Sequence, residues 1–133
     1  MKKIVALSLL PLAAGCMEQR PMEMSARAQT ELAAALEGRT AEAPQSCVPS
    51  RDLRSNRSAG EGAIIFDTPS RNLIYVNRPA AGCPEIRPGV ALKTRTPSTQ
   101  LCAGDIVEVV DLVAGFSHGG CGLGEFTPYR RLR

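Results

Sequence analysis

Tryptophan is absent from this 133-residue chain, and aromatic residues make up only 4% of it. We therefore expect a small core built mainly from aliphatic side chains. Basic residues barely exceed acidic ones: the chain has 16 and 13, and without Lys2 and Lys3 the balance is 14 to 13. Nucleic-acid binders usually present a strongly basic face, so we expect no nucleic-acid partner.

Long apolar runs are also lacking. After Met1, Lys2 and Lys3, a mostly apolar stretch covers residues 4–14 and contains Pro11. A bilayer-spanning helix needs about 20 apolar residues, and proline disturbs a helix interior, so this stretch does not predict a permanent membrane helix. A short positive segment followed by about a dozen apolar residues is typical of a secretory signal peptide, here residues 1–15.

This stretch ends with Leu12-Ala13-Ala14-Gly15-Cys16, which resembles the lipobox of bacterial lipoproteins. The resemblance implies cleavage before Cys16, a diacylglyceryl group on its sulfur and acylation of the new N-terminus. Two or three acyl chains anchor a protein stably, at about 0.8 kcal/mol per buried methylene. Met17 is not the aspartate that retains lipoproteins in the inner membrane, so the resemblance favours the outer membrane, with the domain facing the periplasm. The alternative is an ordinary signal peptide with an incidental cysteine.

Four further cysteines are spaced far apart in the chain. They are Cys47, Cys83, Cys102 and Cys121, at separations of 36, 19 and 19. Zinc sites usually contain close cysteine pairs, so we expect no metal. An even number of cysteines in a small exported domain is typical of disulfides. Of the three possible pairings we favour Cys83–Cys102 with Cys47–Cys121, because the second closes a long loop, worth about 4 kcal/mol in the chain-entropy model.

A short helix is expected at residues 25–37, after a polar tether at 16–24. Ser25 can accept a hydrogen bond from the first turn, and Gly38 is the residue type that ends helices. Apolar residues recur at helical spacing and form one thin stripe. The stripe consists of Ala28, Leu32, Ala35 and Leu36. Residues 39–46 are expected to form a linker, which completes the segment 25–46.

Strand patterns dominate the remaining segment, 47–133, which we expect to be a disulfide-stabilised β domain. Residues 63–67 and 72–77 flank a turn at 68–71 and predict a hairpin. Other expected elements are a weak first strand at 47–57, strands at 89–96 and 105–111, a glycine-rich loop at 115–124 and an extended piece at 125–133. The fold class is therefore mainly β: a small twisted antiparallel sheet or partly open five-stranded barrel, preceded by one short helix.

Three features contain residue types of catalytic or phosphate sites, and for each we favour a structural role. His118 has no activated serine or cysteine beside it, so we expect a solvated loop histidine. The glycines of 115–124 precede no helix that would hold a phosphate, so they indicate a turn around a disulfide. These glycines are Gly115, Gly119, Gly120, Gly122 and Gly124. We expect Asp105 and Asp111 to mark strand ends and Glu108 to lie on an exposed face.

Arginines are concentrated in two short segments. They recur every third residue near the start of the β domain and crowd the C-terminal tail. These residues are Arg51, Arg54, Arg57, Arg130, Arg131 and Arg133. They form a candidate surface for an anionic partner such as lipid head groups or polysaccharide. The alternative that we favour is a solvated charged face.

From residue 45 onward, about 85 residues resemble a family of small, uncharacterised proteobacterial envelope proteins with four cysteines. The resemblance rests on Gln45-Ser46-Cys47, strands 64–66 and 74–77, Cys83-Pro84, Leu101-Cys102-Ala103-Gly104-Asp105-Ile106 and Cys121-Gly122-Leu123-Gly124-Glu125-Phe126-Thr127-Pro128-Tyr129. It implies an exported domain with four cysteines and carries no mechanism.

The expected function is that of a lipid-anchored bacterial envelope protein with a binding or structural role. Its expected partners are the membrane, through the lipid on Cys16, and another envelope protein or a polysaccharide. The alternative is a small inhibitor or ligand-binding module, similar to lysozyme inhibitors in architecture only. We expect neither enzymatic activity nor a cofactor, because no nucleophile, metal set or cofactor loop stands out.

Overall fold

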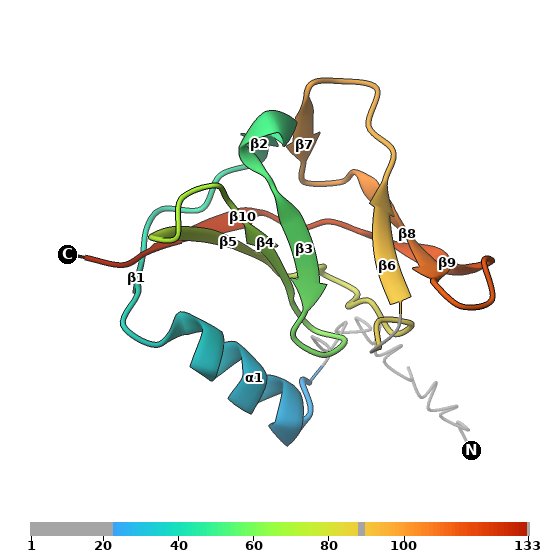
Figure 1. Cartoon of the computed structure of the whole chain (residues 1–133), viewed down its shortest axis with the longest axis horizontal. Coiled ribbons are helices and arrows are strands. Elements are labelled where there is room, and N and C mark those ends of the chain that lie inside the picture. The colour runs from blue at the N-terminus through green and yellow to red at the C-terminus, as the bar shows by residue number, and fades with distance from the viewer. Residues whose placement is uncertain (1–22, 88–89, 133) are drawn as a thin grey trace, which may run out of the picture.

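The structure is a computed structural model that describes residues 23–87 and 90–132. It contains one α-helix and ten strands arranged in three antiparallel sheets (Figure 1). The predicted mainly β fold with one short helix in front is confirmed. The strands are shorter and more numerous than expected, and over the described residues they form no closed barrel.

The largest sheet has five strands in the order β1-β10-β5-β4-β3. Their bounds are β1 Thr40–Ala41, β10 Phe126–Arg130, β5 Leu73–Asn77, β4 Ile64–Asp67 and β3 Ser55–Ser58. The two-stranded sheet pairs β2 Cys47–Pro49 with β7 Gln100–Cys102, and the 3-10 turn η1 is Ser50–Asp52. The three-stranded sheet has the order β6-β8-β9, with β6 Val90–Thr94, β8 Ile106–Asp111 and β9 Ser117–Gly122.

Helix α1 (Ala26–Leu36) covers one face of the five-stranded sheet. The Ser25 side chain accepts a hydrogen bond from the Ala28 amide at 3.2 Å, as the sequence predicts. Leu32 packs with apolar side chains that alternate along β4 and β5, because every second residue of a strand points to the same face. Those sheet residues are Ile65, Ile74 and Val76. The predicted helix and its buried stripe are confirmed.

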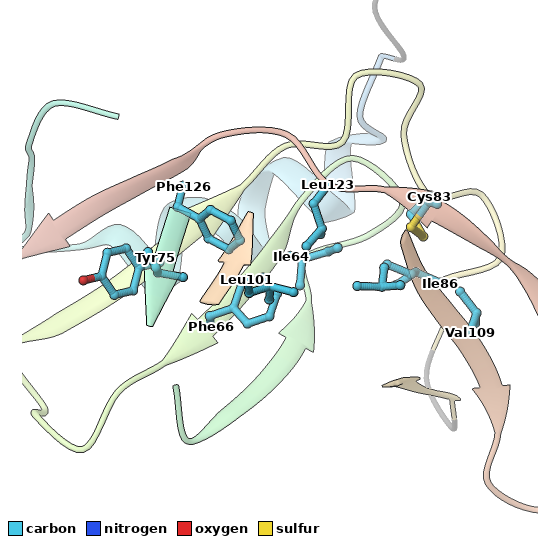
Figure 2. Packing of buried hydrophobic residues seen from close by; sticks show 12 residues of the cluster. Ile64, Phe66, Tyr75, Cys83, Ile86, Leu101, Val109, Leu123 and Phe126 are labelled. Carbon is cyan, nitrogen blue, oxygen red and sulfur yellow. A yellow bond between two sulfur atoms is a disulfide. The ribbon is translucent and has the colours of Figure 1, made fainter. Parts of the chain in front are cut away.

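The opposite face of this sheet forms the main core, to which all three sheets contribute. Figure 2 shows Phe66 from β4, Phe126 from β10, Leu101 from β7 and Val109 from β8 within this cluster. The two phenylalanine rings lie 5.5 Å apart between centroids. One core thus holds the five-stranded sheet against the two smaller ones.

Both disulfides connect cysteines other than those we favoured. The bonds are Cys47–Cys102 and Cys83–Cys121, so the four cysteines are all oxidised but the favoured pairing is wrong. Cys47 and Cys102 are directly opposite each other in the β2–β7 register. The β2–β7 register therefore explains the Cys47–Cys102 bond, which loop length alone does not predict.

The glycine-rich residues 115–124 were expected to form a loop, but they contain strand β9. Gly120 allows this strand to lie close to β8: a Cβ there would meet the Val107 carbonyl oxygen at 2.7 Å. The expected first strand 47–57 is divided by η1 into β2 and β3, and β7 was not expected. The predicted hairpin at 63–77 is confirmed as β4 and β5.

Several predictions fall on residues that the structure does not describe. They concern the signal segment 1–15, the acylated Cys16, most of the 16–24 tether, and Arg133. Within residues 23–87 and 90–132, no helix is long and apolar enough to cross a bilayer.

Candidate functional site: an arginine pocket

A pocket of about 430 Å³ opens where β3 begins and β4 turns into β5. Three arginines from separate segments line it: Arg39, Arg54 and Arg71. Hydroxyl-bearing Ser55, Thr68 and Ser70 and the carboxylate Asp67 complete its polar wall. This group is called the arginine pocket below. In Figure 1 the β4–β5 turn that carries part of it lies toward β1, away from the β8–β9 hairpin.

Local hydrogen bonds fix the walls of the arginine pocket. The Thr68 hydroxyl lies 2.9 Å from the Leu73 carbonyl oxygen and accepts from the Ser70 amide at 3.2 Å, which holds the tight β4–β5 turn. The Arg54 amide donates to the Asp67 carbonyl at 2.8 Å, which places Arg54 beside the end of β4. The β4–β5 turn and the segment that carries Arg54 are therefore both fixed by short-range hydrogen bonds.

Arg39 is the least well paired group in the pocket. Its Nη2 donates to the Arg71 carbonyl at 3.0 Å, but its Nε and Nη1 are buried with no hydrogen-bond partner among the described residues. The pKa of Arg39 is lowered, chiefly by burial and next by the positive charge of Arg131, while Asp67 acts in the opposite direction. The surroundings therefore hold this guanidinium in an electrostatically unfavourable position.

Asp67 does not neutralise the three lining arginines. Arg57 contacts it with Nε at 3.3 Å and Nη2 at 3.4 Å, and the Ser55 hydroxyl lies 3.1 Å from it. Within the described part of the chain, no carboxylate lies within 4.0 Å of the cationic nitrogens of Arg39, Arg54 or Arg71. Three arginines and one aspartate line the pocket, so its lining carries a net charge of +2.

Arg131 adds a further charge behind this pocket. Its amide donates to the Asn72 carbonyl at 2.8 Å, and its Nη2 donates to the Glu37 carbonyl at 3.1 Å, just past the end of α1. Cations are favoured at this end of a helix. The C-terminal strand thus brings Arg131 next to Arg39 across 92 positions of sequence.

Of the arginines in the predicted anionic-partner surface, the structure gathers Arg54, Arg57 and Arg131 around this pocket. It separates two others: Arg51 lies 3.8 Å from Asp52, and Arg130 forms a 2.6 Å salt bridge with Glu42. That salt bridge also raises the pKa of Arg130. Arg39 and Arg71 were missed by the sequence reasoning. Arg39 follows Gly38, and Arg71 is the last residue of the predicted 68–71 turn. These chain-reversal signals locate the two arginines only once the sheet order is known.

The predicted strand-end carboxylates lie elsewhere, with the expected structural roles. Asp105 accepts from the Cys102 amide at 2.8 Å, and Asp111 accepts from two amides of the following turn. Glu108 faces outward and lies 3.4 Å from Arg95. None of the three lines the arginine pocket.

His118 lies on strand β9, not in the expected loop. Its Nε2 is 3.1 Å from Arg87 Nη2 and 3.4 Å from Asp111 Oδ2, so it can accept from one or donate to the other. The nearby Cys121 is engaged in a disulfide. His118 therefore belongs to a polar cluster directly behind the turn of the β8–β9 hairpin.

Within the residues that the structure describes, no group of three or more His, Cys, Asp or Glu side chains is arranged to hold a metal ion. No protein-family model, no curated protein and no solved structure matches the chain. The resemblance to a four-cysteine envelope family therefore stays a prediction. Any functional proposal must rest on the geometry of the chain itself, and the arginine pocket is its most distinctive feature.

Proposed function

We propose that this protein is a lipid-anchored component of the bacterial envelope whose domain binds an anionic group of another envelope component in the arginine pocket. The observation that carries the proposal is the set of lining arginines: among the residues that the structure describes, no carboxylate lies within 4.0 Å of the cationic nitrogens of Arg39, Arg54 or Arg71. The bound group is an oxyanion, a carboxylate or phosphate, displayed by an envelope polysaccharide or protein.

Simple electrostatics support an oxyanion as the partner of this pocket. Burial and the positive charge of Arg131 lower the pKa of Arg39, and a bound anion would act in the opposite direction. The planar guanidinium presents its donors as a fork that matches carboxylate and phosphate oxygens. An oxyanion in the pocket would accept hydrogen bonds from the exposed side chains of Arg54 and Arg71, and its charge would offset the repulsion between Arg39 and Arg131. The wide opening suits one charged group on a larger molecule, with water filling the remaining space.

The test of the pocket uses inorganic phosphate as a probe of the purified, acylated protein. Binding to the folded state raises the melting temperature as phosphate increases at constant ionic strength set with chloride. Wild type should show this rise, and Arg54→Gln and Arg71→Gln should lose most of it. Arg51→Gln removes the same charge from a position that does not line the pocket, so it should behave as wild type. Equal responses in all four proteins would overturn the proposal.

The anchoring part of the proposal has a separate test. The full chain is expressed in a bacterium, the envelope is fractionated, and intact masses are measured with and without reduction. The expected species is membrane-bound, begins at Cys16, is heavier by its acyl chains, and gains four hydrogens when both disulfides are reduced. A soluble, unacylated species would overturn the anchoring and leave the pocket to be judged on phosphate binding alone.

A further inference from the structure

The turn at the tip of the β8–β9 hairpin exposes a group of large apolar side chains. Leu112 is 68% exposed, Val113 94% and Phe116 62%. Single exposed apolar residues are common on protein surfaces, but three within five positions of one turn form a patch that indicates an interaction site. Figure 1 shows that this tip projects from the molecule at the end opposite β1.

Hydrogen bonds within the turn order the backbone of this tip. Asp111 Oδ1 accepts from the Val113 and Ala114 amides at 2.8 Å each. The Gly115 amide donates to the Asp111 carbonyl at 2.9 Å, and the Asp111 amide donates to the Phe116 carbonyl at 3.0 Å. Gly115 has φ +77, which permits the reversal. Three amides of the turn are therefore paired within it, which lowers the cost of withdrawing the tip from water.

Charged side chains lie directly behind the tip. Residues 112–116 contain no ionisable side chain. Behind them, Asp111 Oδ2 lies 3.7 Å from Arg87 Nη2 and 3.4 Å from His118 Nε2, and Arg87 Nη1 lies 3.4 Å from Glu85 Oε2. Arg87 is thus paired with two carboxylates, and the apolar tip is backed by a ring of paired polar side chains. An apolar end with polar groups directly behind it matches the change from acyl chains to head groups at a bilayer surface.

We propose that Leu112, Val113 and Phe116 enter the head-group region of the lipid bilayer and form a second membrane contact beside the lipid on Cys16. The inference rests on the proposed anchoring, which keeps the domain near the membrane. From Cys16 to Ala26, the first residue of α1, the chain can span at most about 35 Å when fully extended. A tether of this length keeps the domain beside the bilayer. Since the arginine pocket lies at the end of the molecule opposite the tip, it would face away from a membrane that the tip contacts.

The absence of tryptophan makes this contact directly measurable. In Phe116→Trp the introduced indole is the sole tryptophan of the molecule. Leu132→Trp is the matched control, because Leu132 is 74% exposed and follows β10 at the opposite end. Each acylated protein is reconstituted into phosphatidylethanolamine–phosphatidylglycerol vesicles with or without brominated acyl chains. We expect brominated lipid to quench the Phe116→Trp emission by more than half and to leave the Leu132→Trp emission nearly unchanged.

The outcomes separate this inference from the anchoring. Acylated protein that floats with the vesicles while the Phe116→Trp emission is unquenched would overturn the tip contact alone. Quenching of Phe116→Trp in protein whose mass shows no acyl chains would support the tip and overturn the anchor. Protein that neither floats nor is quenched would overturn both. Adding Val113→Asp to the Phe116→Trp protein places a charge at the most exposed tip position and should remove most of the quenching.

Discussion

The two ends of the molecule differ in how they are built and in what they leave unsatisfied. The arginine pocket draws Arg39, Arg54 and Arg71 from three separate segments, and none of them is paired with a carboxylate among the described residues. The β8–β9 tip comes from one continuous segment, three amides of its turn are paired within the turn, and its large exposed side chains are apolar. Arginines without carboxylate partners favour an oxyanion, and an apolar turn favours lipid. The same core holds both ends, so their different preferences arise from local chemistry.

The largest effect is expected from Phe126, which is fully buried where the sheets meet. Its replacement should destabilise the core that holds both ends of the molecule. Phe126→Ala should lower the free energy of unfolding by about 3–5 kcal/mol, because it leaves a cavity in the core. Phe116→Ala, at the exposed tip, should stay within about 0.5 kcal/mol of wild type. Chemical denaturation checks both values. Similar effects of the two variants would mean that the tip is part of the core.

The second prediction concerns the two disulfides, which stabilise different parts of the fold. Cys83–Cys121 ties β9 to the chain that follows β5, and Cys47–Cys102 joins β2 to β7. In the chain-entropy model each bond contributes about 4 kcal/mol. Replacing Cys83 and Cys121 together by alanine should raise amide exchange first in β9, whereas replacing the other pair should raise it first in β2 and β7. A peptide map of the unreduced protein that links Cys47 to Cys121 would contradict this assignment.

Lowering the pH should weaken the hydrogen bonds of the hairpin tip before it affects the arginine pocket. The pKa of Asp111 is lowered, mainly because its carboxylate accepts from the Ala114 and Val113 amides. The stabilisation it gives is therefore fully present above the ordinary pKa of an aspartate and is lost as pH falls through the lowered folded value. The protection of the Val113 and Ala114 amides against exchange, relative to an unfolded peptide at the same pH, should fall in that window. Asp111→Asn, which keeps an acceptor but does not titrate, should remove this pH dependence; an unchanged pH profile would contradict the role of Asp111.

The smallest expected effect on stability is that of Arg39→Gln. Burial and the charge of Arg131 disfavour the Arg39 guanidinium in the folded protein, so the neutral variant should unfold at no lower temperature than wild type in chloride buffer. Its gain in melting temperature on adding phosphate should nevertheless disappear. A strongly destabilised Arg39→Gln protein would show that Arg39 has a structural role instead. Thermal unfolding in the two buffers distinguishes these results.

Elements with a strong local pattern were predictable from the sequence. Ser25 and the stripe containing Leu32 located α1, and the turn at 68–71 located the β4–β5 hairpin. Strand β9 was not predictable in this way, because glycines carry no alternation. It forms because Gly120 permits close approach to the Val107 carbonyl, a reason that exists only once β8 is beside it.

The candidate site was predictable only in part. The sequence indicated Arg54, Arg57 and Arg131 as members of an anionic-partner surface but placed them with Arg51 and Arg130, which the fold pairs with Asp52 and Glu42. Arg39 and Arg71 reach the pocket through the order of strands in the five-stranded sheet. The cysteine pairing failed for the same reason, since it depends on which strands become neighbours.

The most direct test of oxyanion binding is a phosphate titration followed by NMR of the arginine Nε–Hε groups. We predict that the Nε–Hε signals of Arg39, Arg54 and Arg71 shift together and saturate. The signal of Arg27, which is paired with Glu31 on the exposed face of α1, should stay in place. Signals that do not move, or that all drift in parallel without saturation, would contradict a specific oxyanion site in the arginine pocket.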